Sequence, residues 1–155
     1  MQRAEGIAIA EAKAAAMVHR CGVTAPEHVN PLAYAASLGV TVYDGKLRGA
    51  QAQLVRVRDR AAIVRADRGR DDRARAFSIA HERGHLELLH ASRPVVELCS
   101  PAPRAPRGQR SVEAEANRYS GAALMPSTLV QPLCEVPTMT LDVAHAITRW
   151  FPVSI

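Results

Sequence analysis

The stretch "DDRARAFSIAHERGHLELLH", residues 71–90, carries the clearest pattern in the chain. Its apolar residues recur at a helical period, and two aspartates stand where the positive end of the helix dipole would lie. Inside it, His81 and His85 are four residues apart, and Glu82 follows the first histidine directly. Four residues turn an α-helix by about 400°, so the two histidines project from nearly the same face. The stretch therefore predicts a central helix around which a small domain packs.

Two histidines at this spacing can bind one metal ion, with each ring nitrogen about 2.0 to 2.1 Å from it. Glu82 lies about 100° around the helix from His81, where its carboxylate can act as a base without being a ligand. In a chain of this composition the pattern arises by chance on the order of one time in a hundred, so a second feature is needed. The alternative is a solvent-facing histidine pair beside an exposed glutamate. The apolar flanks "AFSIA" and "LELL" argue against it, because unpartnered polar groups in a buried helix cost several kcal/mol.

A catalytic zinc ion requires a third protein ligand, and "SVEAEAN", residues 111–117, offers two carboxylates. Glu113 and Asn117 are four residues apart and share a face whose neighbours are small. We assign Glu113 as the third ligand and keep Glu115, about 200° away and directed toward solvent, as the fallback. The Asn117 side-chain carbonyl is expected to accept a hydrogen bond from the free ring N–H of a ligating histidine.

Other residues near the motif have structural interpretations. His90 and Arg83 are assigned to the outer face of the motif helix, His90 near its C-terminal dipole and neither as a ligand. Gly84 costs about 1 kcal/mol in a helix interior relative to alanine, which predicts the close approach of another element. Tyr119 is interpreted as a core residue, with a role as an oxyanion donor as the alternative.

The preceding and following segments predict an α+β fold. The strands "VTVYDG" and "AQAQLVRVRDRAAIVRA" indicate a sheet of about three strands, antiparallel or mixed, packed on the motif helix. Residues 91–110, rich in proline and arginine, predict a long loop, and Ser111 then caps the next helix. Further helices are expected over residues 3–19, after Asn30 as a cap, and after Thr140 as a cap.

The 155 residues predict a single domain, 1–155. The net charge of +5 comes from arginines scattered among acids, and an aromatic content of only 4% argues against a nucleic-acid groove. The three cysteines lack a Cys-x-x-Cys spacing, so reduced thiols are expected. No run of about 18 apolar residues is present, which predicts a cytoplasmic protein without a membrane span.

The order of these features resembles the ImmA/IrrE family of metallo-endopeptidases, zincins of the gluzincin type. The resemblance rests on "RAFSIAHERGHLELLH", a proline-rich gap, "EAEANRYSGAALMP" and finally "LDVAHAITRWFPVS", which together cover about half the chain. One departure is Arg83, where the family usually has an apolar residue; we expect altered packing there and intact chemistry. Members also usually continue with another helix beyond "FPVS".

The resemblance implies a small zincin-like domain in which His81, His85 and Glu113 bind zinc and Glu82 is the catalytic acid and base. It also implies a protein substrate, a helix-turn-helix transcriptional repressor whose cleavage switches on mobile-element (phage) or stress-response genes. Zincins hold the substrate against an edge strand, for which "AQAQLVRV" or "AAIVRA" is expected. Two alternatives stay open: a binding module with this fold that inactivates its repressor with little or no proteolysis, and an arginine-dependent DNA-binding regulator.

Overall fold

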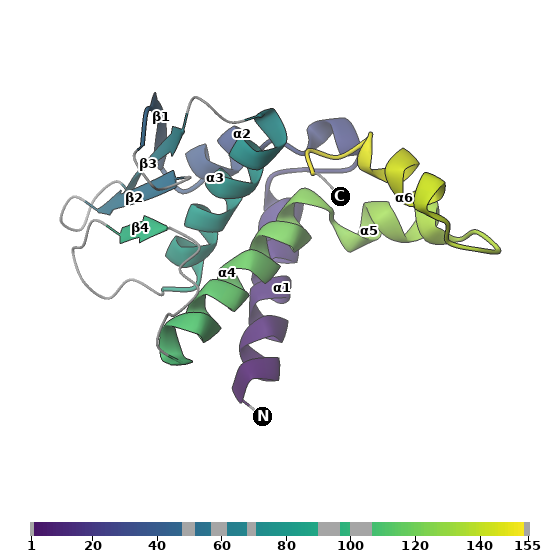
Figure 1. The fold of residues 1–155 in the computed structure, drawn as a ribbon, viewed down its shortest axis with the longest axis horizontal. Helices are drawn as coiled ribbons and strands as arrows, with labels where there is room; N and C mark the ends of the chain where they lie inside the picture. Colours follow the sequence, from purple (N-terminus) through teal and green to yellow (C-terminus); the bar gives the residue numbers. More distant parts are fainter. Residues whose placement is uncertain are drawn as a thin grey trace.

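The computed structural model describes residues 2–47, 52–56, 62–67, 71–89, 97–99 and 107–153. It is a helix-rich α+β fold, with its strands gathered at one end (Figure 1). The helices are α1 (Gln2–Arg20), α2 (Pro31–Ala36), α3 (Asp72–Glu87), α4 (Arg107–Leu124), α5 (Ser127–Val130) and α6 (Leu141–Thr148), with 3-10 turns η1 (Pro26–His28) and η2 (Gln131–Cys134). The strands are β1 (Thr41–Gly45), β2 (Ala52–Arg56), β3 (Ala62–Asp67) and β4 (Glu97–Cys99).

The sheet has four strands in the order β1-β3-β2-β4, so the prediction of about three strands was wrong. It is mixed, because β1 pairs with β3 in parallel while β2 is antiparallel to both β3 and β4. The fourth strand comes from the segment predicted as an uninterrupted loop, residues 91–110. Its three residues are too few to show an alternation of apolar and polar side chains, which is why the sequence pattern missed it.

The sheet edges also differ from the prediction. The two candidate edge segments form β2 and β3, which both lie inside the described sheet, whereas β1 and β4 form its edges. The end of the predicted loop is different as well, since α4 begins at Arg107 and Ser111 lies inside the helix rather than at its cap. The rest of that segment, residues 91–96 and 100–106, lies outside the described residues.

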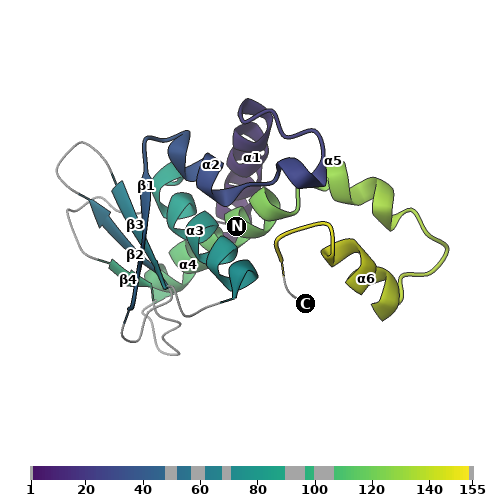
Figure 2. The ribbon, with the colours of Figure 1, turned by 90° about the horizontal axis from the view of Figure 1, so that it is seen from above.

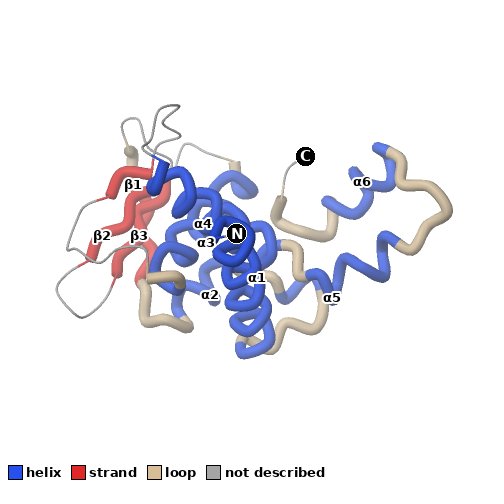
Figure 3. Tube along the Cα trace, turned by 90° about the horizontal axis from the view of Figure 1, so that it is seen from below, coloured by secondary structure: helices blue, strands red, loops and turns tan. Residues whose placement is uncertain are grey.

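The helices form layers behind the sheet. Helix α3 lies between the strands on one side and α4 and α1 on the other (Figure 2). Seen from below, α5 and α6 extend away from the helical centre at the end opposite the strands (Figure 3). The core has two parts: one between α3, α2 and the sheet, around Ile79 and Leu54, and a larger one among the helices, around Met17, Tyr119 and Phe151.

Two of the predicted capping residues, Asn30 and Thr140, cap their helices, and Asp71 is a further cap. The Asn30 side chain accepts hydrogen bonds from two backbone N–H groups at the start of α2, and Gly39 beyond that helix has a φ of 68°. The Asp71 carboxylate caps α3 in the same way, and the Thr140 hydroxyl caps α6. These caps fix where α3 starts, and hence which of its side chains face each neighbour. Within the described ranges, no helix combines the length and the apolar content needed to cross a membrane.

Candidate metal centre

Helix α3 is enclosed on nearly all sides. From Ser78 to His85 every residue is buried, including two histidines, a glutamate and an arginine. The sheet, α2 and α4 each cover one part of its surface. Polar side chains this deep need partners, and α3 has two separate groups of them on its two sides.

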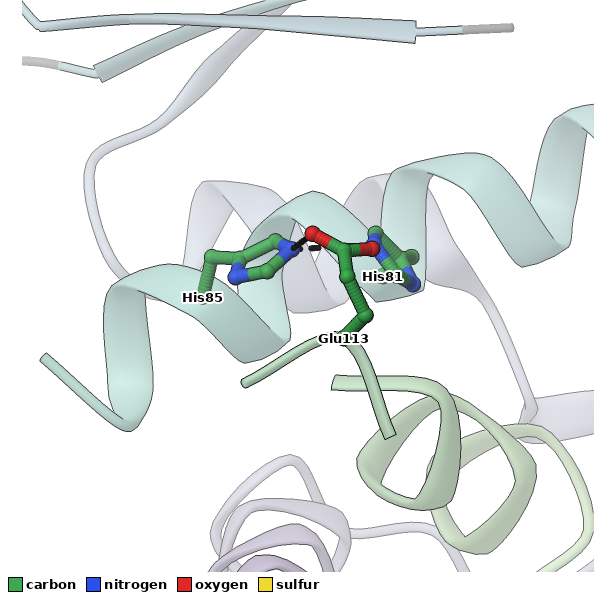
Figure 4. Close-up of side chains that lie close together, drawn as sticks. All are labelled: His81, His85 and Glu113. Carbon is green, nitrogen blue, oxygen red and sulfur yellow. Dashed lines mark hydrogen bonds and ion pairs between the residues drawn. The ribbon is translucent and has the colours of Figure 1, made fainter. Parts of the chain in front are cut away.

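On the side facing α4, three side chains converge. The Nε2 atoms of His81 and His85 lie 2.9 Å apart. The Glu113 carboxylate reaches from α4 toward both rings, with Oε2 3.2 Å from His81 Nε2 and Oε1 3.5 Å from His85 Nε2 (Figure 4). Potential ligand atoms of the three residues all lie within 4.8 Å of one another.

This triangle has the dimensions of a metal site. Ligands about 2.05 Å from a tetrahedral zinc ion are about 3.3 Å from one another, which follows from the tetrahedral angle. The three contacts, 2.9, 3.2 and 3.5 Å, lie around that value. Two imidazoles and one carboxylate are also a common donor set for a catalytic zinc ion, in which the fourth position is left for water or substrate. The residues present therefore fit a bound metal ion.

Asn117 lies one turn beyond Glu113 on α4 and contacts the first histidine. Its Oδ1 is 2.9 Å from His81 Nδ1. In this arrangement the ring N–H at Nδ1 donates to the amide oxygen, which leaves Nε2 as the lone-pair atom that faces Glu113. The contact that the sequence predicted for Asn117 is thus present in the geometry.

Glu82 is buried on α3 next to His81, with only 1% of its surface exposed. Its position about 100° around the helix from His81 places it beside the histidine face without joining the three converging side chains. The site is open on the α4 side, because the Glu113 side chain is 37% exposed while that of His85 is 1% exposed. A substrate would therefore approach past Glu113.

Glu115, the fallback ligand, is directed elsewhere. A Cβ atom added at Gly6 of α1 would lie 2.5 Å from Glu115 Oε1, so this carboxylate packs on α1 and takes no part in the cluster. Glu115 is half-buried, so the expectation that it faces solvent was wrong. The reason is that α1 lies along α4 and covers the face that the sequence alone leaves open.

Arg83 is the clearest difference from the sequence analysis. It was assigned to the outer face of the motif helix, but it is 1% exposed. Its Nε donates a hydrogen bond of 2.8 Å to the Tyr34 carbonyl, and its Nη1 is 3.1 Å from Glu87 Oε2. The available signal was the spacing of Arg83 and Glu87, four residues apart, which permits an ion pair on one helix face. His90, the other residue of the predicted outer face, lies outside the described residues.

Burial shifts two pKa values on this opposite side. It raises the pKa of Tyr34 to about 12, since the ionised phenolate would be poorly solvated, although nearby Arg83 acts in the other direction. It lowers the pKa of Arg83, an effect that the Glu87 carboxylate partly offsets. The Tyr34 hydroxyl is buried and has no hydrogen-bond partner among the described residues.

Glycine is unfavourable in a helix interior, which predicted a close neighbour at Gly84, and the structure has one. A Cβ atom there would lie 3.1 Å from Cδ1 of Tyr119, whose side chain is fully buried on α4. The prediction of a packing contact at Gly84 and of a core position for Tyr119 is confirmed. The absence of a side chain at Gly84 lets α4 approach α3 closely enough for Glu113 to reach both histidines.

A cavity of about 780 Å³ lies on another face of α4, between α1 and α5. Ala15 of α1, Met125 near the end of α4 and Thr128 of α5 are among its lining residues. None of the three converging side chains lines it, so it is separate from the candidate metal centre.

The chain matches a known protein family. The sequence model described as the IrrE N-terminal-like domain, Peptidase M78, matches residues 35–149. The matched segment contains both histidines of α3 and Glu113 of α4. Among curated proteins, no sequence similar to this chain was found.

Proposed function

This chain belongs to the IrrE N-terminal-like domain family, Peptidase M78, and we propose that it is a zinc-dependent endopeptidase acting on a helix-turn-helix transcriptional repressor. The family supports a metallopeptidase-type domain. The observation that carries the proposal further is the convergence of His81, His85 and Glu113, with distances that suit a tetrahedral ion. A zincin-like arrangement, in which the histidine helix packs on a mixed sheet, is part of the same proposal.

The proposed mechanism assigns one task to each polar group around the site. When bound, zinc supplies Lewis-acid polarisation of the scissile carbonyl and lowers the pKa of the attacking water. Glu82 accepts the proton of that water and then returns it to the leaving amine. Asn117 holds the His81 ring by its Nδ1–H, so that Nε2 keeps its lone pair for the metal.

The substrate class rests on the resemblance to the ImmA/IrrE family, whose members typically cut, or promote the cutting of, such repressors. The described sheet offers β4 as an edge strand on which an extended peptide can pair by its main chain. Because relief of repression requires contact with a DNA-bound regulator, the proposed place of action is the cytoplasm. The expected biological setting is a mobile element or a stress response.

The test is a cleavage assay with the purified chain, zinc, and helix-turn-helix repressors from the same genome, beginning with any that a neighbouring gene encodes. The wild type should convert the repressor into two fragments on a gel, and Glu82→Gln should slow this by at least about 100-fold while it retains the metal. Glu115→Gln is the matched control, since that carboxylate packs on α1, and it should cleave normally. Relief of repression that survives Glu82→Gln without any cleavage would instead establish a binding module.

A further inference from the structure

Arg83 lies on the side of α3 away from the histidines and contacts a second helix there. Its Nε donates to the backbone carbonyl of Tyr34 at 2.8 Å, and its Nη2 lies 3.5 Å from the Ser37 hydroxyl oxygen. Tyr34 is in the last turn of α2, where carbonyl groups lack a partner within the helix. This carbonyl also accepts a hydrogen bond of 2.7 Å from the Ser37 hydroxyl, so the arginine is its second donor and joins α2 to α3.

The same guanidinium also connects α3 to α1 through Glu87. Arg83 Nη1 is 3.1 Å from Glu87 Oε2, and Arg20 Nη2 of α1 is 3.3 Å from the other carboxylate oxygen. Lys13 of α1 donates to the Glu87 backbone carbonyl at 2.7 Å. The C-terminal end of α3 is therefore held from two positions on α1.

The third contact of Arg83 is with α4, the helix that carries Glu113. The guanidinium carbon lies 5.6 Å from the centre of the Tyr119 ring, within the range of a cation–π interaction. The same ring packs tightly on Gly84, where a Cβ atom would lie 3.1 Å from Tyr119 Cδ1 and the ring would have to move slightly. Tyr119 is two residues beyond Asn117, so its packing fixes the rotation and height of α4 next to α3.

From these contacts we infer that Arg83 is a positioning residue for the metal centre, which acts through Tyr119 to set how α4 sits against α3. The inference rests on the proposed metal site and adds a residue on the opposite side of α3. Contacts of about 3 Å between Glu113 and two histidines leave little tolerance, since misplacement by about 1 Å is costly in a preorganised site. No other described arginine is as deeply buried.

The alternative is that Arg83 contributes to stability alone, and the two roles can be separated. Removing one partner of a buried ion pair costs stability, but Glu87 is 15% exposed and keeps its contact with Arg20, so Arg83→Met is expected to fold with a lowered unfolding free energy. Methionine fills much of the arginine volume but can neither bond the Tyr34 carbonyl nor interact with the Tyr119 ring as a cation. A positioning role predicts a weaker metal site in the folded protein, whereas a role in stability alone predicts only a lowered unfolding free energy.

The experiment compares zinc affinity, the Co²⁺ absorption spectrum and metal-free urea unfolding for wild type, Arg83→Met and Arg83→Lys. Arg118→Ala is the control, because Arg118 is an exposed arginine of α4 that pairs with Glu11 of α1. We expect Arg83→Met to bind zinc about 10- to 100-fold more weakly, with an altered Co²⁺ band, as for other groups that orient metal ligands. Arg83→Lys keeps the charge but loses the hydrogen bond to the Tyr34 carbonyl. Its zinc affinity should fall by at least about threefold, because the metal ligands are then less well oriented. Arg118→Ala should match the wild type.

Wild-type zinc affinity and Co²⁺ spectrum in Arg83→Met, with only its unfolding midpoint lowered, would overturn the inference. If Arg83→Met does not fold, Arg83→Lys decides, and wild-type affinity in that variant has the same consequence. These outcomes are distinct from failure of the proposed function. A wild type that binds one metal ion but cuts no repressor would contradict the function and leave the positioning role intact.

Discussion

Opposite sides of α3 hold buried polar side chains in different ways. On the α4 side, two histidines face a half-exposed glutamate, and their distances suit an ion that the three would share. On the other side, Arg83 is enclosed and bonded to groups of the chain itself, a carbonyl of α2 and a carboxylate of α3. One side is arranged for a bound metal ion and stays accessible, while the other is closed and internally paired.

One helix of 16 residues thus carries both the candidate metal ligands and the residues that hold the neighbouring helices in place. The residues of the metal side gain little stability from one another, because their converging nitrogen and oxygen atoms are suited to share a cation rather than to pair with each other. The residues of the arginine side form the joint between α1, α2, α3 and α4, and so define where the metal side lies. Loss of the Glu87 carboxylate on the closed side should therefore appear mainly in stability, and changes on the open side mainly in metal affinity. Replacing Arg83 itself should reach the metal side as well, through its contact with Tyr119 of α4.

The largest effect on stability is expected from Glu87→Ala. It leaves Arg83 buried without its carboxylate, and removing one partner of a buried pair costs about 3 kcal/mol in the free energy of unfolding. Urea unfolding of the metal-free protein measures this. Glu11→Ala removes a carboxylate from an exposed pair and should cost less than about 1 kcal/mol. Equal losses of unfolding free energy in the two variants would mean that the buried pair on the closed side contributes no more than an exposed pair.

Asn117→Ala should act on the open side. Without its amide oxygen the His81 ring loses the group that fixes its orientation, and zinc affinity should fall about 10- to 100-fold. Asn117 is exposed, so the unfolding free energy of the metal-free chain should hardly change. Asn117→Asp keeps an acceptor oxygen and serves as the control, with affinity near wild type. Competition with a chelating dye reports each value, and an unchanged affinity in the alanine variant would remove Asn117 from the site.

Gly84→Ala tests the boundary between the two sides. Alanine gains about 1 kcal/mol in helix propensity, but its Cβ would press on the buried Tyr119 ring, and overpacking costs about 1 to 3 kcal/mol. A net loss of about 1 kcal/mol is expected. Gly121→Ala is the matched case on α4, where nothing lies within 4 Å of the added atom, and it should be neutral or stabilising. Thermal unfolding that ranks the two variants in the opposite order would contradict the close packing.

The smallest effect concerns the Tyr34 hydroxyl on the closed side. Its folded-state pKa of about 12 lies above the ordinary value of 10.0, so the unfolded chain releases this proton at lower pH than the folded chain does. The contribution of the Tyr34 hydroxyl to the unfolding free energy is therefore fully present below about pH 10 and is lost as the pH rises toward 12. Tyr34→Phe should show a shallower alkaline decline than the exposed-site control Tyr43→Phe. Identical declines would place the Tyr34 hydroxyl in contact with solvent.

The sequence was informative where local chemistry sets position. The histidine spacing, the caps at Asn30 and Thr140 and the cost of Gly84 depend on neighbours along one helix, and each pointed to the arrangement that the structure has. The convergence of the histidines with Glu113 depends on a second helix. The small residues next to Glu113 indicated that this helix could approach closely.

It was uninformative where distant elements decide. Arg83 looks like a surface residue until α2 covers it, and Glu115 looks solvent-facing until α1 lies along α4. The short strand β4 shows no periodicity of its own and exists through its pairing with β2. In each case the missing information is which distant segment packs on the residue. The hydrophobic period and the angular position on a helix do not give it.

The central claim, that α3 and α4 together form a metal site, is tested most directly by metal content. Elemental analysis after dialysis against a buffer free of trace metals should give about one zinc ion per wild-type chain, if the three residues bind it together. Glu113→Gln should lose most of it, while Glu115→Gln, changed in the same way two residues along α4, should keep it. Full zinc retention in Glu113→Gln, or equal loss in both variants, would contradict the account.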